Sequence, residues 1–298
     1  MEHNRVIALG FFDGVHRGHG ALLARCRQRA DERGCRAAVM TFDLHPDTLV
    51  TGQDMGLLSS PEDRADLMRR LYGIDDVLVC HFDRTMMEMP WQAFVEDYLF
   101  GKLDAAAVVC GHDFRFGYRG EGNPQRLAEV CAQLGMGCDV IGKVEYDGVT
   151  VSSTYIRSLI ETGDMARANA FLGHRHTLSG EVVHGRQLGR RMGTPTANLL
   201  LPAHVLAPAF GVYAAEVFTA GGVYMAVTNV GVRPTVGGGD VVTVEPWLLD
   251  FDGDLYGQTI RVEFCQFLRP ERKFDSLEQL QSAILENADQ TRAYFESH

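Results

Sequence analysis

The chain has 298 residues, of which 46% are hydrophobic, and it is therefore long enough for two domains that each bury a core. Its net charge of −11 excludes the broad basic surface of a typical nucleic-acid-binding protein, and no apolar run is long enough to span a membrane. The N-terminus lacks the basic and apolar regions of a signal peptide, and the seven cysteines form no Cys-x-x-Cys pair, as is typical of reduced thiols. We therefore expect a cytoplasmic protein with no nucleic-acid or membrane partner, whose oligomeric state the sequence does not indicate.

The first half of the chain alternates short apolar runs with amphipathic stretches. Strands are predicted over residues 6–9, 37–40, 77–79 and 106–109, and helices over residues 21–33 and 91–103. Strands separated by helices of this length are typical of an α/β domain with a parallel sheet. Ligands of such domains usually bind at the carboxyl ends of the strands.

The pattern changes after residue 172. A helical stretch over residues 155–172 ends at a linker of residues 173–176, and short alternating runs follow at residues 180–183, 211–217, 224–227 and 260–264. Such runs, punctuated by glycine, predict a small antiparallel β-barrel, and residues 276–295 return to helical periodicity. We expect two domains, residues 1–173 and residues 178–298.

Residues 10–19, Gly-Phe-Phe-Asp-Gly-Val-His-Arg-Gly-His, connect the first predicted strand to the first predicted helix. His16 and His19, three positions apart, would share one face of the opening helical turn, and Gly18 would let a phosphate approach the helix N-terminus. Two imidazoles there would stabilise charge that develops on an α-phosphate. The four-residue pattern alone also arises by chance, and a zinc site is disfavoured because no third ligand follows at a recognised spacing.

A second motif, Ser-Ser-Thr-x-x-Arg at residues 152–157, opens the last helix of the first domain. The hydroxyl groups of Ser153 and Thr154 would cap this helix, and Arg157 on its first turn could form charge-assisted hydrogen bonds with ATP phosphates. The alternative is a capped surface helix without a ligand.

In the second domain, residues 184–198 are rich in glycine and end in Pro-Thr-Ala-Asn. In an extended chain Thr196 and Asn198 point to the same side, where a hydroxyl and an amide oxygen suit Mg²⁺ that carries ATP phosphates. The glycine-rich loop could close over those phosphates, and Glu245 could accept the proton of a primary hydroxyl that attacks the γ-phosphate. The alternatives are a Gly-Pro turn that leads into an edge strand and a solvated strand glutamate.

In order and spacing, these motifs resemble the bacterial bifunctional riboflavin kinase/FMN adenylyltransferases, or FAD synthetases. The resemblance covers almost the whole chain and includes segments 10–19, 41–46, 111–117, 152–157, 185–198, 211–213, 229–235 and 250–257. It implies a Rossmann-like, nucleotidyltransferase-type α/β domain followed by a small antiparallel β-barrel riboflavin kinase domain with a C-terminal helix. The implied reactions are phosphorylation of riboflavin to FMN and adenylation of FMN to FAD with release of pyrophosphate, both with ATP and Mg²⁺.

The resemblance also assigns roles to individual residues. It implies that His16 and His19 are catalytic in the first domain, that Glu245 is the general base of the second, and that Thr196 and Asn198 bind the metal. The ATP-binding residues that it implies are Gly10, Phe11, Phe12, Gly18, Ser153, Thr154 and Arg157 in the first domain and Gly185, Gly189, Arg190 and Gly193 in the second. The flavin-binding residues that it implies are His45, Asp113, Phe114, Phe116 and Arg233.

The sequence departs from the family pattern at four positions. Leu44 stands where the family usually has proline, Thr194 where it has a bulky residue, and Trp247 where it often has histidine. Pro246, directly after Glu245, removes a hydrogen-bond donor from the strand and restricts Glu245 to extended geometry. An adenylyltransferase with an impaired kinase module is therefore the nearest alternative, and a non-catalytic, flavin-binding regulatory protein is the other.

Overall fold

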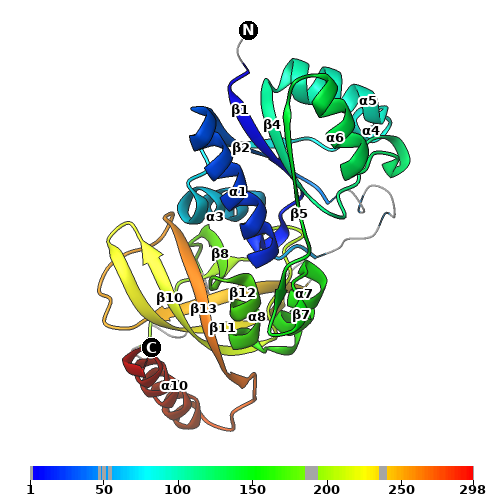
Figure 1. Cartoon of the computed structure of the whole chain (residues 1–298). Coiled ribbons are helices and arrows are strands. Elements are labelled where there is room, and N and C mark those ends of the chain that lie inside the picture. Colours follow the sequence, from blue (N-terminus) through cyan, green and yellow to red (C-terminus); the bar gives the residue numbers. More distant parts are fainter. Residues whose placement is uncertain are drawn as a thin grey trace. The chain divides into compact units, whose positions relative to one another are not determined.

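The computed structural model describes residues 3–45, 48, 52, 56–184, 194–234 and 240–297 (Figure 1). The chain divides into two compact units. The first consists of Met1–Gly56 and Pro61–Ser152, and the second of Leu57–Ser60 and Ser153–His298. Within the described residues, no helix is both long and apolar enough to cross a membrane.

The first unit is built on a five-stranded parallel sheet. Its strands are β1 (Arg5–Leu9), β2 (Arg36–Phe42), β3 (Asp76–Cys80), β4 (Ala105–Gly111) and β5 (Gly137–Ile141), in the order β3-β2-β1-β4-β5. Val6 and Ala8 face one buried cluster and Ile7 and Leu9 face another, so the central strand is apolar on both faces. The predicted α/β domain with a parallel sheet is thereby confirmed.

Helices cover both faces of this sheet (Figure 1). One face packs against α1 (Arg17–Arg33) and α3 (Pro61–Tyr72), and the other against α6 (Pro124–Gln133) and η2 (Phe94–Lys102). The remaining elements are η1 (Asp13–Val15), α4 (Arg84–Met87), α5 (Trp91–Ala93), η3 (Tyr118–Gly120), and the short strands β6 (Glu145–Tyr146) and β7 (Val149–Thr150). The helix predicted over residues 91–103 is an α-helical turn, α5, followed by the π-helical segment η2.

The second unit contains a six-stranded antiparallel sheet. Its strands are β8 (His176–Glu181), β9 (Leu199–Leu200), β10 (Gly211–Thr219), β11 (Gly222–Pro234), β12 (Asp240–Leu248) and β13 (Thr259–Pro270), in the order β8-β13-β10-β11-β12-β9. A bridge between Val182, just after β8, and Leu199 of β9 brings the two edge strands together. The sheet therefore nearly closes into a barrel, as predicted.

Among its described residues, the second unit contains three helices, namely α7 (Ser153–Thr162), α8 (Met165–Leu172) and α10 (Leu277–Ser297). The single helix predicted over residues 155–172 is two helices, because Gly163 adopts a positive φ of 81° and Asp164 caps the second helix. Gly173 ends α8 in the left-handed conformation, and β8 already begins at His176, so the predicted linker is only a tight turn. The C-terminal helix is confirmed as α10, whose Ala288 packs against Val212 and Val227 of the sheet.

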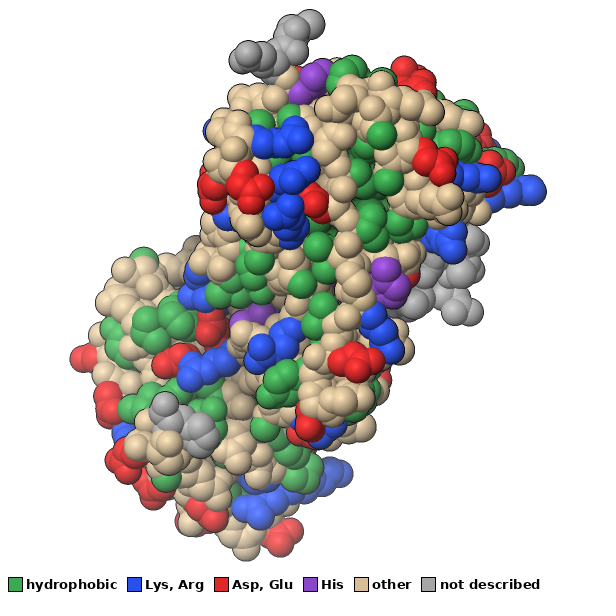
Figure 2. Space-filling model, in the orientation of Figure 1, with side chains coloured by type: hydrophobic (Ala, Val, Ile, Leu, Met, Phe, Trp, Pro, Cys, Tyr) green, Lys and Arg blue, Asp and Glu red, His purple; other side chains and the backbone are tan. Residues whose placement is uncertain are grey.

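The surface carries both signs of charge. Figure 2 shows basic and acidic side chains interspersed on the face in view, without a broad basic area. This distribution agrees with the net charge of −11.

Candidate active sites

The loop that follows β1 is strained. Phe12 lies in the left-handed region with φ 61° and ψ 30°, Gly14 has φ 73°, and the β-branched Val15 has φ 45°. Positive φ is unfavourable for residues with a Cβ, and most of all for a β-branched one, so surrounding contacts must hold this conformation. One such contact is the hydroxyl of Thr41, which donates to the carbonyl of Phe11 at 2.7 Å. Strain of this kind often marks a functional site.

The structure brings His16 and His19 together at the start of α1. His16 is the N-cap of the helix, and its Nδ1 accepts a hydrogen bond from the backbone N–H of His19 at 3.2 Å. The two rings stack with their centroids 3.6 Å apart and an interplanar angle of 11°. Because Nδ1 of His16 is an acceptor, the neutral ring carries its proton on Nε2, which leaves an N–H donor at the helix N-terminus.

His19 is held in its neutral form. Burial, and then the electrostatic influence of His16 and of the Arg64 guanidinium, lower the pKa of His19 well below its usual value. Its Nδ1 is buried and has no hydrogen-bond partner among the described residues. The ring of Phe12 packs against the imidazole of His19 in an edge-to-face arrangement, with 5.2 Å between centroids. The strained loop and the histidine pair therefore form one packed group.

Gly10 and Gly18 are required by packing, because a side chain at either position would crowd a neighbouring ring. A Cβ at Gly18 would lie 3.1 Å from the ring of His16, and a Cβ at Gly10 would lie 3.1 Å from the ring of Phe12. Both glycines make room for an aromatic ring over the loop. His45, three residues after the end of β2, lies edge to face with Phe11, with 4.6 Å between ring centroids. The predicted residues Gly10, Phe11, Phe12, His16, Gly18, His19 and His45 thus lie at the carboxyl ends of β1 and β2.

Another predicted group lies after β4, which is the neighbour of β1 in the sheet. Phe114 and Phe116 stack with centroids 5.4 Å apart, and Phe116 also contacts Phe94. Asp113 precedes them in a turn closed by the hydrogen bond from the Phe114 N–H to the carbonyl of Gly111, at 3.2 Å. Because β1 and β4 are parallel, both groups follow carboxyl ends at the same edge of the sheet, where α/β domains bind ligands.

Ser153, Thr154 and Arg157 lie within the first five residues of α7. This helix belongs to the second compact unit, whereas the two histidines belong to the first. Their predicted role in ATP binding stays a prediction.

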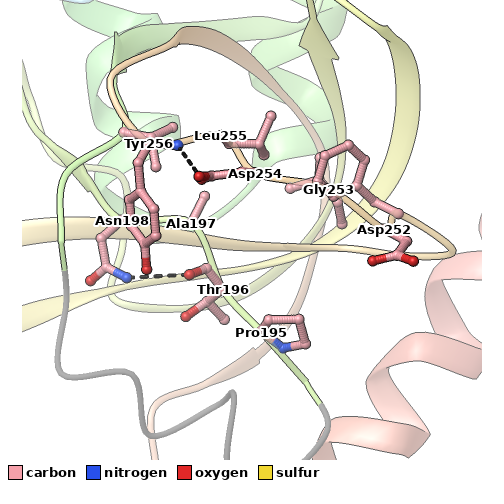
Figure 3. A pocket seen from close by; sticks show the side chains of 12 residues that line it. Pro195, Thr196, Ala197, Asn198, Asp252, Gly253, Asp254, Leu255 and Tyr256 are labelled. Atoms are coloured by element: carbon pink, nitrogen blue, oxygen red, sulfur yellow. Dashed lines mark hydrogen bonds between the residues drawn. The ribbon is translucent and has the colours of Figure 1, made fainter.

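The second unit contains a cavity of about 350 Å³ around the predicted metal ligands (Figure 3). Its lining comprises Val182, Pro195, Thr196, Ala197, Asn198, Leu248, Phe251, Asp252, Gly253, Asp254, Leu255 and Tyr256. The amide nitrogen of Asn198 donates to the backbone carbonyl of Thr196 at 3.5 Å. Because the side-chain nitrogen of Asn198 points to the backbone, its amide oxygen is left for another partner. This oxygen and the hydroxyl of Thr196 are the kinds of oxygen ligand that suit a hard cation.

A larger cavity, of about 660 Å³, contains Glu245. It is lined by Thr194, Thr196, Val212, Val227, Asn229, Glu245, Trp247, Arg269, Glu271, Arg272, Lys273, Phe274, Leu280, Ile284 and Asn287. Thr196 lines both cavities, whereas Asn198 lines only the smaller one and Glu245 only the larger one. The hydroxyl of Thr243 donates to Oε1 of Glu245 at 3.1 Å, which orients the carboxylate.

Pro246 does not break the pairing of its strand with β11. The register runs without interruption, with Glu245 opposite Asn229 and Pro246 opposite Thr228. The carbonyl of Pro246 accepts from the N–H of Ala197 at 2.9 Å. Since the N–H and C=O of a strand residue point to the same side, the donor that proline lacks would face Ala197 and not β11. Pro246 therefore ties the strand of Glu245 to the segment of Thr196 and Asn198.

Some predicted residues lie outside the described part of the chain. These are Gly185, Gly189, Arg190 and Gly193. The backbone of Arg233 belongs to β11, but its side chain is also outside the described part.

The sequence motifs missed several residues of both sites. Arg64 of α3 is fully buried and contacts Phe11, and no pattern indicates it, because an arginine in an amphipathic helix is normally exposed. No binding role was assigned to Asn229, Trp247 or Arg269 of the larger cavity, although Asn229 begins a segment that the resemblance includes and Trp247 was noted as a departure from the family pattern.

Family comparisons match both halves of the chain. A model described as FAD synthetase matches residues 1–155, and one described as riboflavin kinase matches residues 172–295. The bifunctional riboflavin kinase/FMN adenylyltransferase of Listeria monocytogenes is 36% identical to this chain, over 98% of this chain and 93% of the relative. The protein of the same description from Pseudomonas fluorescens is 38% identical, over 97% of this chain and 92% of the relative. A solved structure described as a macrolide-efflux protein from Streptococcus pneumoniae has a TM-score of 0.86 and 29% identity, covering 98% of this chain and 95% of that one.

Proposed function

The chain belongs to the bifunctional riboflavin kinase/FMN adenylyltransferase family, and from that premise we propose how its residues divide the two reactions. The protein is an enzyme with both activities, the adenylyltransferase in the N-terminal part and the riboflavin kinase in the C-terminal part. Its substrates are riboflavin, FMN and ATP. We assign the first activity to residues 1–173 and the second to residues 178–298.

In the N-terminal site, a phosphate oxygen of FMN attacks the α-phosphate of ATP. The new P–O bond forms as the bond to the β-phosphate bridge breaks, and pyrophosphate leaves. His16 and His19, at the N-terminus of α1, stabilise the charge that develops on the α-phosphate, because the helix end and a neutral imidazole N–H both present donors there. Gly10, Phe11, Phe12, Gly18, Ser153, Thr154 and Arg157 are proposed to bind ATP, and His45, Asp113, Phe114 and Phe116 to bind FMN.

In the C-terminal site, Glu245 accepts the proton of the terminal ribityl hydroxyl of riboflavin as that oxygen attacks the γ-phosphate of ATP. The new O–P bond forms, the bond to the β-phosphate bridge breaks, and ADP leaves. The volume of the larger cavity, about 660 Å³, suits an organic ligand of this size. We propose that Arg233 binds the flavin. We propose that ATP is bound by four residues of the glycine-rich segment, Gly185, Gly189, Arg190 and Gly193.

The oxygen ligands of Thr196 and Asn198 fit Mg²⁺, because one hydroxyl and one amide oxygen line the same small cavity. When bound, Mg²⁺ would neutralise part of the charge of the ATP phosphates. The observation that carries the kinase assignment is the position of Thr196 in both cavities, since it brings the metal-binding segment next to the cavity of the base.

We also propose that the enzyme works in the cytoplasm and has no nucleic-acid or membrane partner. All seven cysteines are free, which suits a reducing compartment. The interspersed surface charges and the acidic net charge support the absence of a nucleic-acid partner.

The test is a chromatographic time course with riboflavin, ATP and MgCl₂ that follows FMN and FAD separately, with a parallel reaction started from FMN. We expect FMN to appear first and FAD to follow. If FAD forms only when FMN is supplied, the proposed kinase activity is contradicted. If the protein binds flavin but consumes no ATP, both proposed activities are contradicted.

A further inference from the structure

Arg64 is the largest fully buried side chain of the described residues. It lies on α3 and reaches the carboxyl ends of two strands. Its Nη1 donates to the carbonyl of Phe11 at 2.6 Å, and its Nη2 donates to the carbonyl of Phe42 at 3.1 Å. The guanidinium carbon lies 4.2 Å from the centre of the Phe11 ring. A buried charge is costly unless its environment compensates it, so these contacts need a reason beyond packing.

The environment keeps Arg64 charged. Burial lowers its pKa to about 10, and the carboxylates of Asp13, Glu62 and Asp43 oppose that shift. The guanidinium is therefore protonated throughout the neutral range. Its Nε is buried and has no hydrogen-bond partner among the described residues. A charged group with a buried, unsatisfied donor at a ligand-binding edge is a functional candidate.

Arg64 holds the strained loop in place. The carbonyl of Phe11 accepts two hydrogen bonds, one from Arg64 and one from Thr41, so both of its lone pairs are used. A peptide fixed in this way directs the next residue, Phe12, into its left-handed conformation. The ring of Phe12 packs on His19, so the contact with Arg64 reaches the imidazole through two residues.

Arg64 also acts on His19 through its charge. The groups that lower the pKa of His19, after burial, are His16 on the same helix and Arg64 on α3. The carboxylates beside Arg64, those of Asp13, Glu62 and Asp43, act on the guanidinium in the opposite sense. The two groups therefore differ in charge near neutral pH. Arg64 stays protonated and supplies a positive charge, whereas His19 remains neutral.

We propose that Arg64 is a positioning residue for adenylyl transfer, which fixes the turn at Phe11 and Phe12 and places a permanent positive charge beside His19. The inference rests on the proposed role of the N-terminal site. Within the first unit, it adds a residue of α3 to proposed site residues that otherwise follow β1, β2 and β4 or begin α1. Its expected signature is a change in pH dependence, which the loss of a packing contact would not produce.

The test compares Arg64→Lys and Arg64→Gln with the wild-type enzyme and with Arg70→Gln. Arg70 is an exposed residue of the same helix and serves as the matched control. For each protein, kcat and KM of FMN adenylation are measured from pH 5 to pH 9, and the titration of the His19 ring is followed by NMR, with His19→Gln used for assignment. The dispersion of the NMR spectrum of the same sample reports on the folding of the first unit, and riboflavin phosphorylation reports on the second.

For Arg64→Gln we expect kcat of adenylation to fall about tenfold or more, with a smaller change in KM for ATP. The acid limb of the profile, and the titration of His19, should move to higher pH, while burial and His16 continue to hold the pKa of His19 below the ordinary histidine value. Arg64→Lys should retain the wild-type acid limb, and Arg70→Gln should behave as wild type.

An Arg64→Gln enzyme with the wild-type pH profile would overturn the proposal, whether its rate is lowered or not. If the first unit of Arg64→Gln does not fold, as judged by collapsed dispersion of its NMR spectrum, a His19 titration in Arg64→Lys that has moved to the ordinary value would overturn it as well. Failure of the proposed adenylyltransferase function can be distinguished from failure of the proposal for Arg64. In the first case the wild-type enzyme itself would make no FAD from FMN.

Discussion

The two candidate sites are organised in different ways. In the N-terminal site, strain, a buried guanidinium and a stacked histidine pair are concentrated in one loop and the helix that follows it. In the C-terminal site, the polar residues line two open cavities that share Thr196. The first arrangement fixes hydrogen-bond donors in the protein itself, whereas the second places the proposed base, Glu245, and the proposed metal ligand Asn198 in different cavities. The difference predicts that substitutions in one site leave the other reaction intact.

The largest effect is expected for Glu245→Gln. Loss of a general base should slow riboflavin phosphorylation by about a hundredfold or more, and adenylation of supplied FMN should be unchanged. Separate assays with riboflavin and with FMN measure the two rates. A normal kinase rate would remove Glu245 as the base.

His19→Ala should produce the reverse pattern. Without the imidazole, FAD formation from FMN should fall by about a hundredfold, while FMN formation from riboflavin stays close to wild type. The same two assays apply, and His19→Gln, which retains a donor of similar length, should keep more of the activity. Equal losses of both activities would contradict the assignment of separate sites.

Thr196→Val should change the metal dependence of one reaction only. It replaces a hydroxyl in the small cavity by a methyl group of similar size, so the MgCl₂ concentration for half-maximal kinase activity should rise by about tenfold. Thr196→Ser retains the oxygen and is the control. A kinase with unchanged magnesium dependence in Thr196→Val would show that this hydroxyl is not a ligand.

His176 makes the stability of the second unit sensitive to acid. Burial, and then the charge of His174, lower the pKa of His176 to about 3. Because the unfolded chain binds a proton near pH 6.5 and the folded one does not, stability should fall by about 1.4 kcal/mol per pH unit as the pH decreases from 6.5 toward 3. Urea unfolding of wild type and His176→Phe at several pH values measures this slope. An equal slope in both proteins would contradict the prediction.

Pro246→Val should have the smallest effect. It restores the N–H that faces Ala197 and leaves the pairing with β11 as it is, so the kinase rate should change by less than about threefold. The kinase assay checks this with Trp247→His as a companion variant. A large gain in kinase rate would mean that Pro246 impairs the wild-type module.

The sequence predicted the two folds because their periodicities differ. Continuous apolar runs between helices indicate a parallel sheet, and short alternating runs indicate a barrel. The break at Gly163 and Asp164 was missed because the apolar spacing continues across it. Arg64 was missed because burial of an arginine depends on carbonyls of Phe11 and Phe42, which are distant in the sequence. The stacking of His16 on His19 follows from the three-residue spacing, which the sequence does show.

The central claim is that two separate sites carry two successive reactions, and a mixing experiment tests it most directly. His19→Ala and Glu245→Gln are each incubated with riboflavin, ATP and MgCl₂, alone and together, and FMN and FAD are followed by chromatography. The account predicts that His19→Ala alone stops at FMN, that Glu245→Gln alone makes neither product, and that the mixture makes FAD. FAD formation from riboflavin at the wild-type rate by either variant alone, or no FAD from the mixture, would contradict it.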